Sequence, residues 1–67
     1  MKIELNGTPH DIAAATATVA DALAELGWAD ARVATALNGD FLPAAARAAQ
    51  PLQDGDRLEV LAPMQGG

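Results

Sequence analysis

The first pattern along the chain is an alternation of polar and apolar residues over residues 2–6, which is typical of a half-buried strand. Asn6 and Gly7 end it, and an Asn-Gly pair suits the two positive φ angles of a type I′ hairpin turn. The returning segment, residues 8–12, contains Pro9, which donates no backbone hydrogen bond and therefore indicates an edge strand. The chain is thus predicted to begin with a β-hairpin at a sheet edge.

The next pattern has helical spacing and starts after Thr18. The Thr18 hydroxyl can cap the first amides of a helix, with Asp21 at the third helical position as in a capping box. Apolar residues then recur at i, i+3, i+4 and i+7: Val19, Ala22, Leu23 and Leu26. Gly27 can end this short helix in the left-handed conformation, with Trp28 packing back on the last turn. The alternative for Trp28 is an anchor for a binding partner.

Two further strands are predicted, at residues 32–37 and 57–62. In the first, larger residues face one way and small residues the other: Val33, Thr35 and Leu37 against Ala34 and Ala36. In the second, Leu58 and Val60 point inward. Between them, a second Asn-Gly pair predicts a turn into a short return segment, and residues 44–49 lie between two prolines that limit them to one or two helical turns.

The order of elements is hairpin, helix, strand, short return and strand. A single main helix lying across one face of a mixed sheet of four to five strands buries both apolar surfaces together. This predicts an α+β fold with the element order of the β-grasp fold. We expect residues 1–62 to form the β-grasp domain and residues 63–67 to form a flexible C-terminal Gly-Gly tail.

The length and net charge of the chain limit the classes of function that are expected. A chain of 67 residues leaves little room for a private active site, so we expect no enzyme activity of its own. Nine acidic against four basic residues give a net charge of −5, which disfavours nucleic acid and anionic membranes. No apolar run approaches a membrane span and no export signal is evident, so the expected location is the cytoplasm.

The attachment points used by small carrier domains are mostly missing. The sequence has no cysteine and no serine, which excludes a thiolate, a phosphopantetheine site and a Cys-ligated metal. The single lysine, Lys2, lies in the first predicted strand, and the single histidine, His10, lies in the hairpin. The distinctive chemical group that is left is the terminal carboxylate of Gly67.

The face of the sheet away from the helix is a candidate docking surface. It is predicted to expose Ala34, Ala36, Glu59 and Leu61. Small side chains would allow a partner to approach closely, and the alternative is a solvated face without a partner.

Several motifs in this order resemble the ubiquitin-like sulfur carrier proteins, and among them the ThiS-type carriers of thiamine biosynthesis. The motifs run along the whole chain: residues 3–7 (IELNG), 18–21 (TVAD) with Leu26-Gly27, 32–34 (RVA), 37–39 (LNG), 54–60 (DGDRLEV) and the final Gly66-Gly67. Each is weak alone, but their order, spacing and shared Gly-Gly end are fairly specific.

The resemblance implies a cycle carried out by partner proteins. An adenylating, E1-like enzyme would use ATP to convert the Gly67 carboxylate to an acyl-adenylate, and a sulfur donor system such as a cysteine desulfurase would turn it into a thiocarboxylate. Thiazole synthase would then take the sulfur for the thiazole moiety of thiamine. The carrier itself would bind no cofactor.

The residues before Gly67 suit such a reaction. Gly66 and Gly67 place no side chain beside the reacting carbon, so the tail could pass through a narrow channel. Pro63 stiffens the base of the tail, while Met64 and Gln65 either contact the channel or act as spacers.

Three alternatives stay open at this point. The chain could be the small subunit of molybdopterin synthase, which shares the fold and the Gly-Gly end. It could be a sulfur carrier of another pathway or a protein-conjugating modifier. It could also be a β-grasp interaction module with a frayed terminus.

Overall fold

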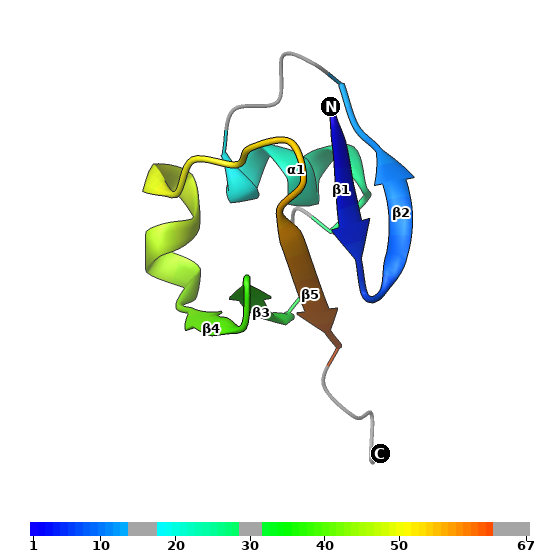
Figure 1. Ribbon diagram of the computed structural model, residues 1–67. Helices are drawn as coiled ribbons and strands as arrows, with labels where there is room; N and C mark the ends of the chain where they lie inside the picture. Colours follow the sequence, from blue (N-terminus) through cyan, green and yellow to red (C-terminus); the bar gives the residue numbers. More distant parts are fainter. Residues whose placement is uncertain (14–17, 29–31, 63–67) are drawn as a thin grey trace.

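The computed structural model describes residues 1–13, 18–28 and 32–62 and contains a five-stranded mixed sheet with one main helix (Figure 1). The elements, in chain order, are β1 (Lys2–Leu5), β2 (Thr8–Asp11), α1 (Val19–Glu25), β3 (Ala34–Leu37), β4 (Asp40–Leu42), the 3₁₀ helix η1 (Ala44–Ala49) and β5 (Arg57–Leu61). The predicted architecture, one main helix on a mixed sheet, is therefore confirmed.

The last strand in the sequence is the central strand of the sheet. The spatial order is β2-β1-β5-β3-β4, with β1 and β5 parallel and the other three pairs antiparallel. The hairpin strand that contains Pro9 lies at an edge, as predicted. Because β5 is central, its backbone pairs with β1 on one side up to Leu58 and with β3 on the other side up to Leu61.

Helix α1 begins and ends at the predicted signals. The Thr18 hydroxyl accepts a hydrogen bond from the amide of Asp21 at 3.2 Å. At the other end Gly27 has φ +91°, and the Trp28 amide donates to the Leu23 carbonyl at 2.7 Å, as in a Schellman motif. Trp28 is half-buried against the core, in agreement with its structural interpretation.

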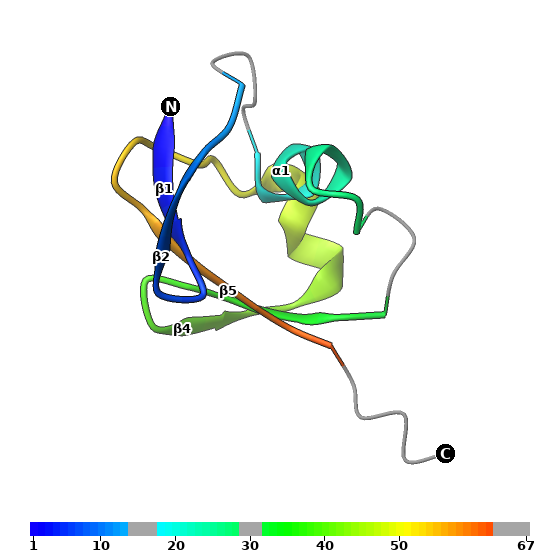
Figure 2. The same cartoon turned by 90° about the vertical axis from the view of Figure 1, so that its right-hand side faces the viewer.

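The core lies between the sheet and the two helical segments, α1 and η1. Figure 2 shows both on one side of the curved sheet. The buried apolar residues come from every layer: Ile3, Ile12, Val19, Ala22, Leu23, Leu42, Leu52, Leu58 and Val60. The aliphatic residues of the chain therefore form a core between the sheet and the helical segments that cover it.

A hydrogen-bonded network links η1 to β3. Thr35 is 2% exposed, and its hydroxyl donates to the Leu42 carbonyl at 2.8 Å while accepting from Nε of Arg47 at 2.9 Å. Arg47 also donates to the Val33 carbonyl. These bonds satisfy a buried hydroxyl and fix the short 3₁₀ helix against the sheet.

Four predicted strand boundaries differ from the observed ones by one or two residues. Two of them are the ends of β2 and β5, which lie at Asp11 and Leu61, one residue earlier than predicted. β1 ends at Leu5 because Asn6 already has the positive φ of the turn. β3 begins at Ala34 instead of at residue 32, because its pairing with β5 begins with Ala34 opposite Leu61. The alternation of sides along these strands is unaffected.

Candidate functional site: the outer sheet face and the end of β5

The sheet face opposite α1 carries the predicted docking residues and one aromatic residue. We call it the outer face, defined by Ala34, Ala36, Phe41, Glu59 and Leu61. Ala34 pairs with Leu61, and Ala36 pairs with Glu59 on one side and Phe41 on the other. Directly opposed residues in antiparallel strands project from the same side of a sheet. The four predicted residues therefore lie together, as two cross-strand pairs.

Two large apolar side chains on this face are open to solvent. Phe41 is 72% exposed and Leu61 is 66% exposed, and they are the exposed large hydrophobic residues of the described part of the chain. Exposed apolar side chains that lie together, aromatic ones in particular, are typical of protein-binding surfaces. The outer face is thus suited to contact with another protein.

Sequence reasoning missed Phe41. Strand β4 is only three residues long, so its own sequence gives no alternation from which to assign a face. The signal is the pairing of Phe41 with Ala36, which only the three-dimensional register supplies.

A shallow apolar hollow lies beside the last described residues. It has a volume of about 430 Å³ and is lined by Arg32, Val33, Ala34, Leu61 and Ala62. Its wall includes the end of β5, directly before residues 63–67. A partner side chain inserted here would be held next to the start of the C-terminal segment.

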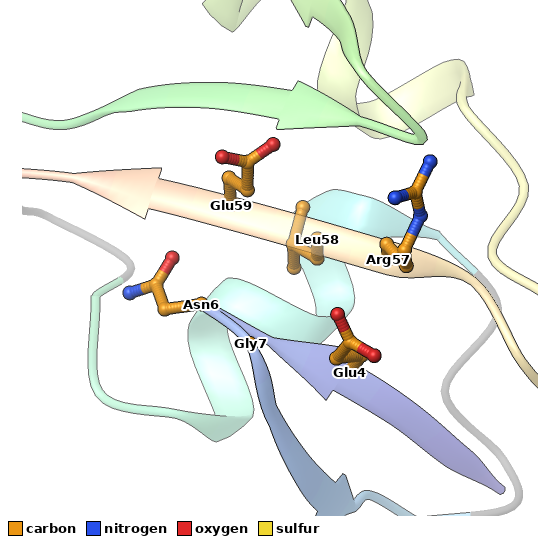
Figure 3. A pocket seen from close by; sticks show the side chains of 6 residues that line it. All are labelled: Glu4, Asn6, Gly7, Arg57, Leu58 and Glu59. Atoms are coloured by element: carbon orange, nitrogen blue, oxygen red, sulfur yellow. The ribbon is translucent and has the colours of Figure 1, made fainter.

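A second hollow, of about 360 Å³, lies between β1 and β5 and is more polar (Figure 3). Its charged side chains are Glu4, Arg57 and Glu59, and Glu4 and Arg57 are neighbours in the parallel pairing. Asn6 and Gly7 close the end nearest the hairpin turn. Besides Glu59, which belongs to the outer face, this hollow adds one acidic group, Glu4, and one basic group, Arg57, to the region around that face.

Other kinds of site find little support in the part of the chain that the structure describes. No group of three or more His, Asp or Glu side chains within it could hold a metal ion. His10 is exposed on β2, as expected for a hairpin residue. No helix among these residues is long and apolar enough to cross a membrane.

Comparison with protein families decides the assignment. A model of the ThiS family matches residues 3–67. The chain belongs to the ThiS family. This match confirms the family resemblance seen in the sequence, and with it the link to thiamine biosynthesis. ThiS is a family of carrier proteins. A search of curated proteins gave no significant match.

Two solved structures of a Geobacter metallireducens protein resemble this ThiS family member. The crystal structure of the thiamine biosynthesis protein ThiS is 36% identical, with a TM-score of 0.83 over the full length of both chains. The solution structure of a thiamine biosynthesis protein from the same organism is 35% identical, with a TM-score of 0.82, over all of this chain and 88% of that one. The ThiS-like β-grasp fold is thereby confirmed.

The predicted tail of this ThiS family member lies outside the described residues. Its five members are Pro63, Met64, Gln65, Gly66 and Gly67. Their roles, and the division of the chain at residue 62, stay predictions. The structure does place the residue before them, Ala62, directly after the central strand and in the lining of the apolar hollow.

Proposed function

We propose that this protein is the sulfur carrier of thiazole formation in thiamine biosynthesis, with Gly67 as its reacting residue. The observation that supports this most is that the match to the ThiS family extends through Gly66 and Gly67. The family supplies the pathway, and the Gly-Gly end supplies the chemical group. The carrier acts in the cytoplasm, where ATP is available to its activating partner.

The terminal carboxylate has to be activated before it can accept sulfur. A chain-terminal carboxyl group has a pKa of about 3.5, so at neutral pH Gly67 carries an anion that resists nucleophilic attack. An adenylating enzyme transfers AMP from ATP to this carboxylate and releases pyrophosphate. A sulfur nucleophile at the oxidation level of sulfide then attacks the carbonyl carbon, AMP leaves, and one oxygen has been replaced by sulfur.

The five residues of the tail suit this reaction in length and bulk. Fully extended, they reach about 17 Å from the folded body, which is enough to enter a recessed active site. Gly66 and Gly67 add no side chain beside the reacting carbon. Pro63 restricts the base of the tail, and Met64 and Gln65 would either contact the walls of the channel or act as spacers.

The outer face is the proposed docking surface for the partner enzymes. Leu61 and Phe41 supply apolar anchors, and Ala34 and Ala36 allow close approach between them. Glu59 and the net charge of −5 favour partners with a basic surface around this contact. Because Leu61 is only two residues from the tail, a partner docked here has the tail within reach of its active site.

The function is tested by intact mass spectrometry of protein co-expressed with the adenylating enzyme and a cysteine desulfurase. A carrier is expected to show a species heavier by the difference between a sulfur and an oxygen atom. A variant with Gly67 deleted is the matched control and should show only its unmodified mass. If the full chain also shows only unmodified mass in every such preparation, the carrier function is wrong.

The pathway is tested separately by recovery of partner proteins. Thiazole synthase captured by the full chain, and lost with Leu61→Arg, supports thiamine biosynthesis. Capture of the large subunit of molybdopterin synthase instead would assign the carrier to the other pathway.

A further inference from the structure

Asn6 forms a two-point contact with the backbone of the central strand. Its Oδ1 accepts a hydrogen bond from the Val60 amide at 2.8 Å, and its Nδ2 donates to the Val60 carbonyl at 3.1 Å. The two residues are 54 positions apart in the sequence. Figure 3 shows the Asn6 side chain at the end of β1, beside β5.

This contact continues the pairing of β1 with β5 after β1 has ended. The amide of Glu4 donates to the Asp56 carbonyl at 2.9 Å, and the amide of Asn6 donates to the Leu58 carbonyl at 3.0 Å. The next groups along β5 are those of Val60, but the main chain turns away at Asn6, where φ is 50°. A carboxamide has the donor and acceptor of a peptide group, so the side chain supplies the bonds that the turn removes.

The contact lies at the end of β5 that leads to the tail. Val60 is two residues before Ala62, the last described residue, and Leu61 is paired on the opposite side with Ala34 of β3. The final residues of β5 are therefore held from both sides. Without Asn6, the β1 side would release β5 after Leu58.

We propose, on the basis of the carrier function above, that Asn6 is a positioning residue that fixes the direction in which the tail leaves the sheet. It acts through Val60 and touches no reacting atom. Each residue freed from the sheet adds conformational entropy that must be removed when the carboxylate enters the partner's site. Loss of the carboxamide therefore lowers the fraction of docked complexes in which Gly67 is placed for reaction.

Asn38 offers a matched control in the same chain. It also precedes a glycine in a tight turn, and its φ of 52° is close to that of Asn6. Its Oδ1 accepts from the Arg57 amide at 2.9 Å, and its Nδ2 donates to Oδ1 of Asp56 at 3.1 Å. Asn38 therefore binds the same strand with the same group, but at the end farther from the tail.

The test compares Asn6→Gly with Asn38→Gly in the full-length protein. Glycine tolerates the positive φ at both positions, so each variant loses the carboxamide without straining its turn. Three quantities are measured for each: the denaturant midpoint, the exchange rates of backbone amide hydrogens, and ATP–pyrophosphate exchange by the cognate adenylating enzyme.

We expect both variants to lower the denaturant midpoint, with different local effects. Amide exchange of Val60 should accelerate in Asn6→Gly, and that of Arg57 in Asn38→Gly. Asn6→Gly should reduce kcat/KM for pyrophosphate exchange about tenfold, mostly through kcat, because docking through the outer face is intact. Asn38→Gly should leave kcat/KM within about twofold of the unchanged protein.

Two results would overturn the role of Asn6. One is an equal effect of both variants on kcat/KM, which would attribute the loss of activity to lower general stability instead of to the position of the tail. The other is an unchanged exchange rate of the Val60 amide in Asn6→Gly. A third result would overturn the carrier function itself: no pyrophosphate exchange with the unchanged protein. The positioning role would then fail as well, but this result is distinguishable from the other two because it needs no variant.

Discussion

Leu58 and Leu61 are the same residue type on the same strand, but they face opposite sides of the sheet. Leu58 is 0% exposed and belongs to the hydrophobic core, whereas Leu61 is 66% exposed on the outer face. A strand alternates its side chains between two faces, so β5 can contribute to the core with one set of residues and to recognition with the other. From this comparison we expect that stability and the proposed partner binding can be changed separately.

The largest expected effect is on the buried side. Leu58→Ala leaves a cavity in the centre of the core and should lower the free energy of unfolding by about 2–5 kcal/mol. Denaturant unfolding followed by circular dichroism measures this loss. Under conditions where the variant is folded, its KM with the adenylating enzyme should stay unchanged, and a raised KM would contradict the separation of the two faces.

A smaller loss is expected from Thr35→Val, on the same buried side. Valine keeps the shape but leaves the Leu42 carbonyl and Nε of Arg47 without the Thr35 hydroxyl. The free energy of unfolding should fall by about 1–3 kcal/mol, as for other buried polar groups that lose a partner. Thermal unfolding monitored by calorimetry is suitable, with Thr8→Val at an exposed position as the control. Equal stability of the two variants would show that the network is not important.

On the outer face, Leu61→Ala should have the opposite profile. The free energy of unfolding should change by less than about 0.5 kcal/mol because the side chain is mostly in water. Loss of an apolar anchor at an interface costs about 1 kcal/mol or more, so the dissociation constant for the adenylating enzyme should rise about fivefold to tenfold. Isothermal titration calorimetry measures it. Unaltered affinity would remove Leu61 from the docking surface.

The smallest expected effect comes from the charge on the outer face. Glu59→Gln removes one negative charge next to Ala36 and should weaken association with a basic partner about twofold to threefold at low salt. The difference should shrink as the salt concentration rises, because exposed charges are screened. Stopped-flow association rates at several salt concentrations measure it, with Asp11→Gln as a control at the far edge of the sheet. Identical salt dependence of both variants would exclude a directed role for Glu59.

The features that the sequence predicted well depend on neighbouring residues. The Thr18 cap, the left-handed Gly27 and the two Asn-Gly turns are set by local backbone chemistry, and all are present in the structure. The sides of β3 and β5 followed from alternation, since Thr35, Leu58 and Val60 are buried as expected. The assignment to a sulfur carrier family followed from the order of these local signals along the chain.

The features that the sequence did not predict depend on residues that are distant in the chain. Arg47 lies in an alanine-rich segment that gives no sign of its contact with Thr35. The exposure of Phe41 depends on its register with Ala36, and the carboxamide of Asn6 finds its partner in Val60. Such contacts are fixed only when the sheet is assembled, so local patterns cannot indicate them.

The central claim is that the Gly67 carboxylate is the group that the partner activates. It is tested most directly by pyrophosphate exchange with a semisynthetic chain that ends in Gly67 carboxamide instead of carboxylate. The docking surface and the tail length are unchanged, but the amide cannot take part in adenylation. We expect this chain to support no exchange while competing with the unmodified protein for the adenylating enzyme. Exchange at the rate of the unmodified protein would contradict the claim.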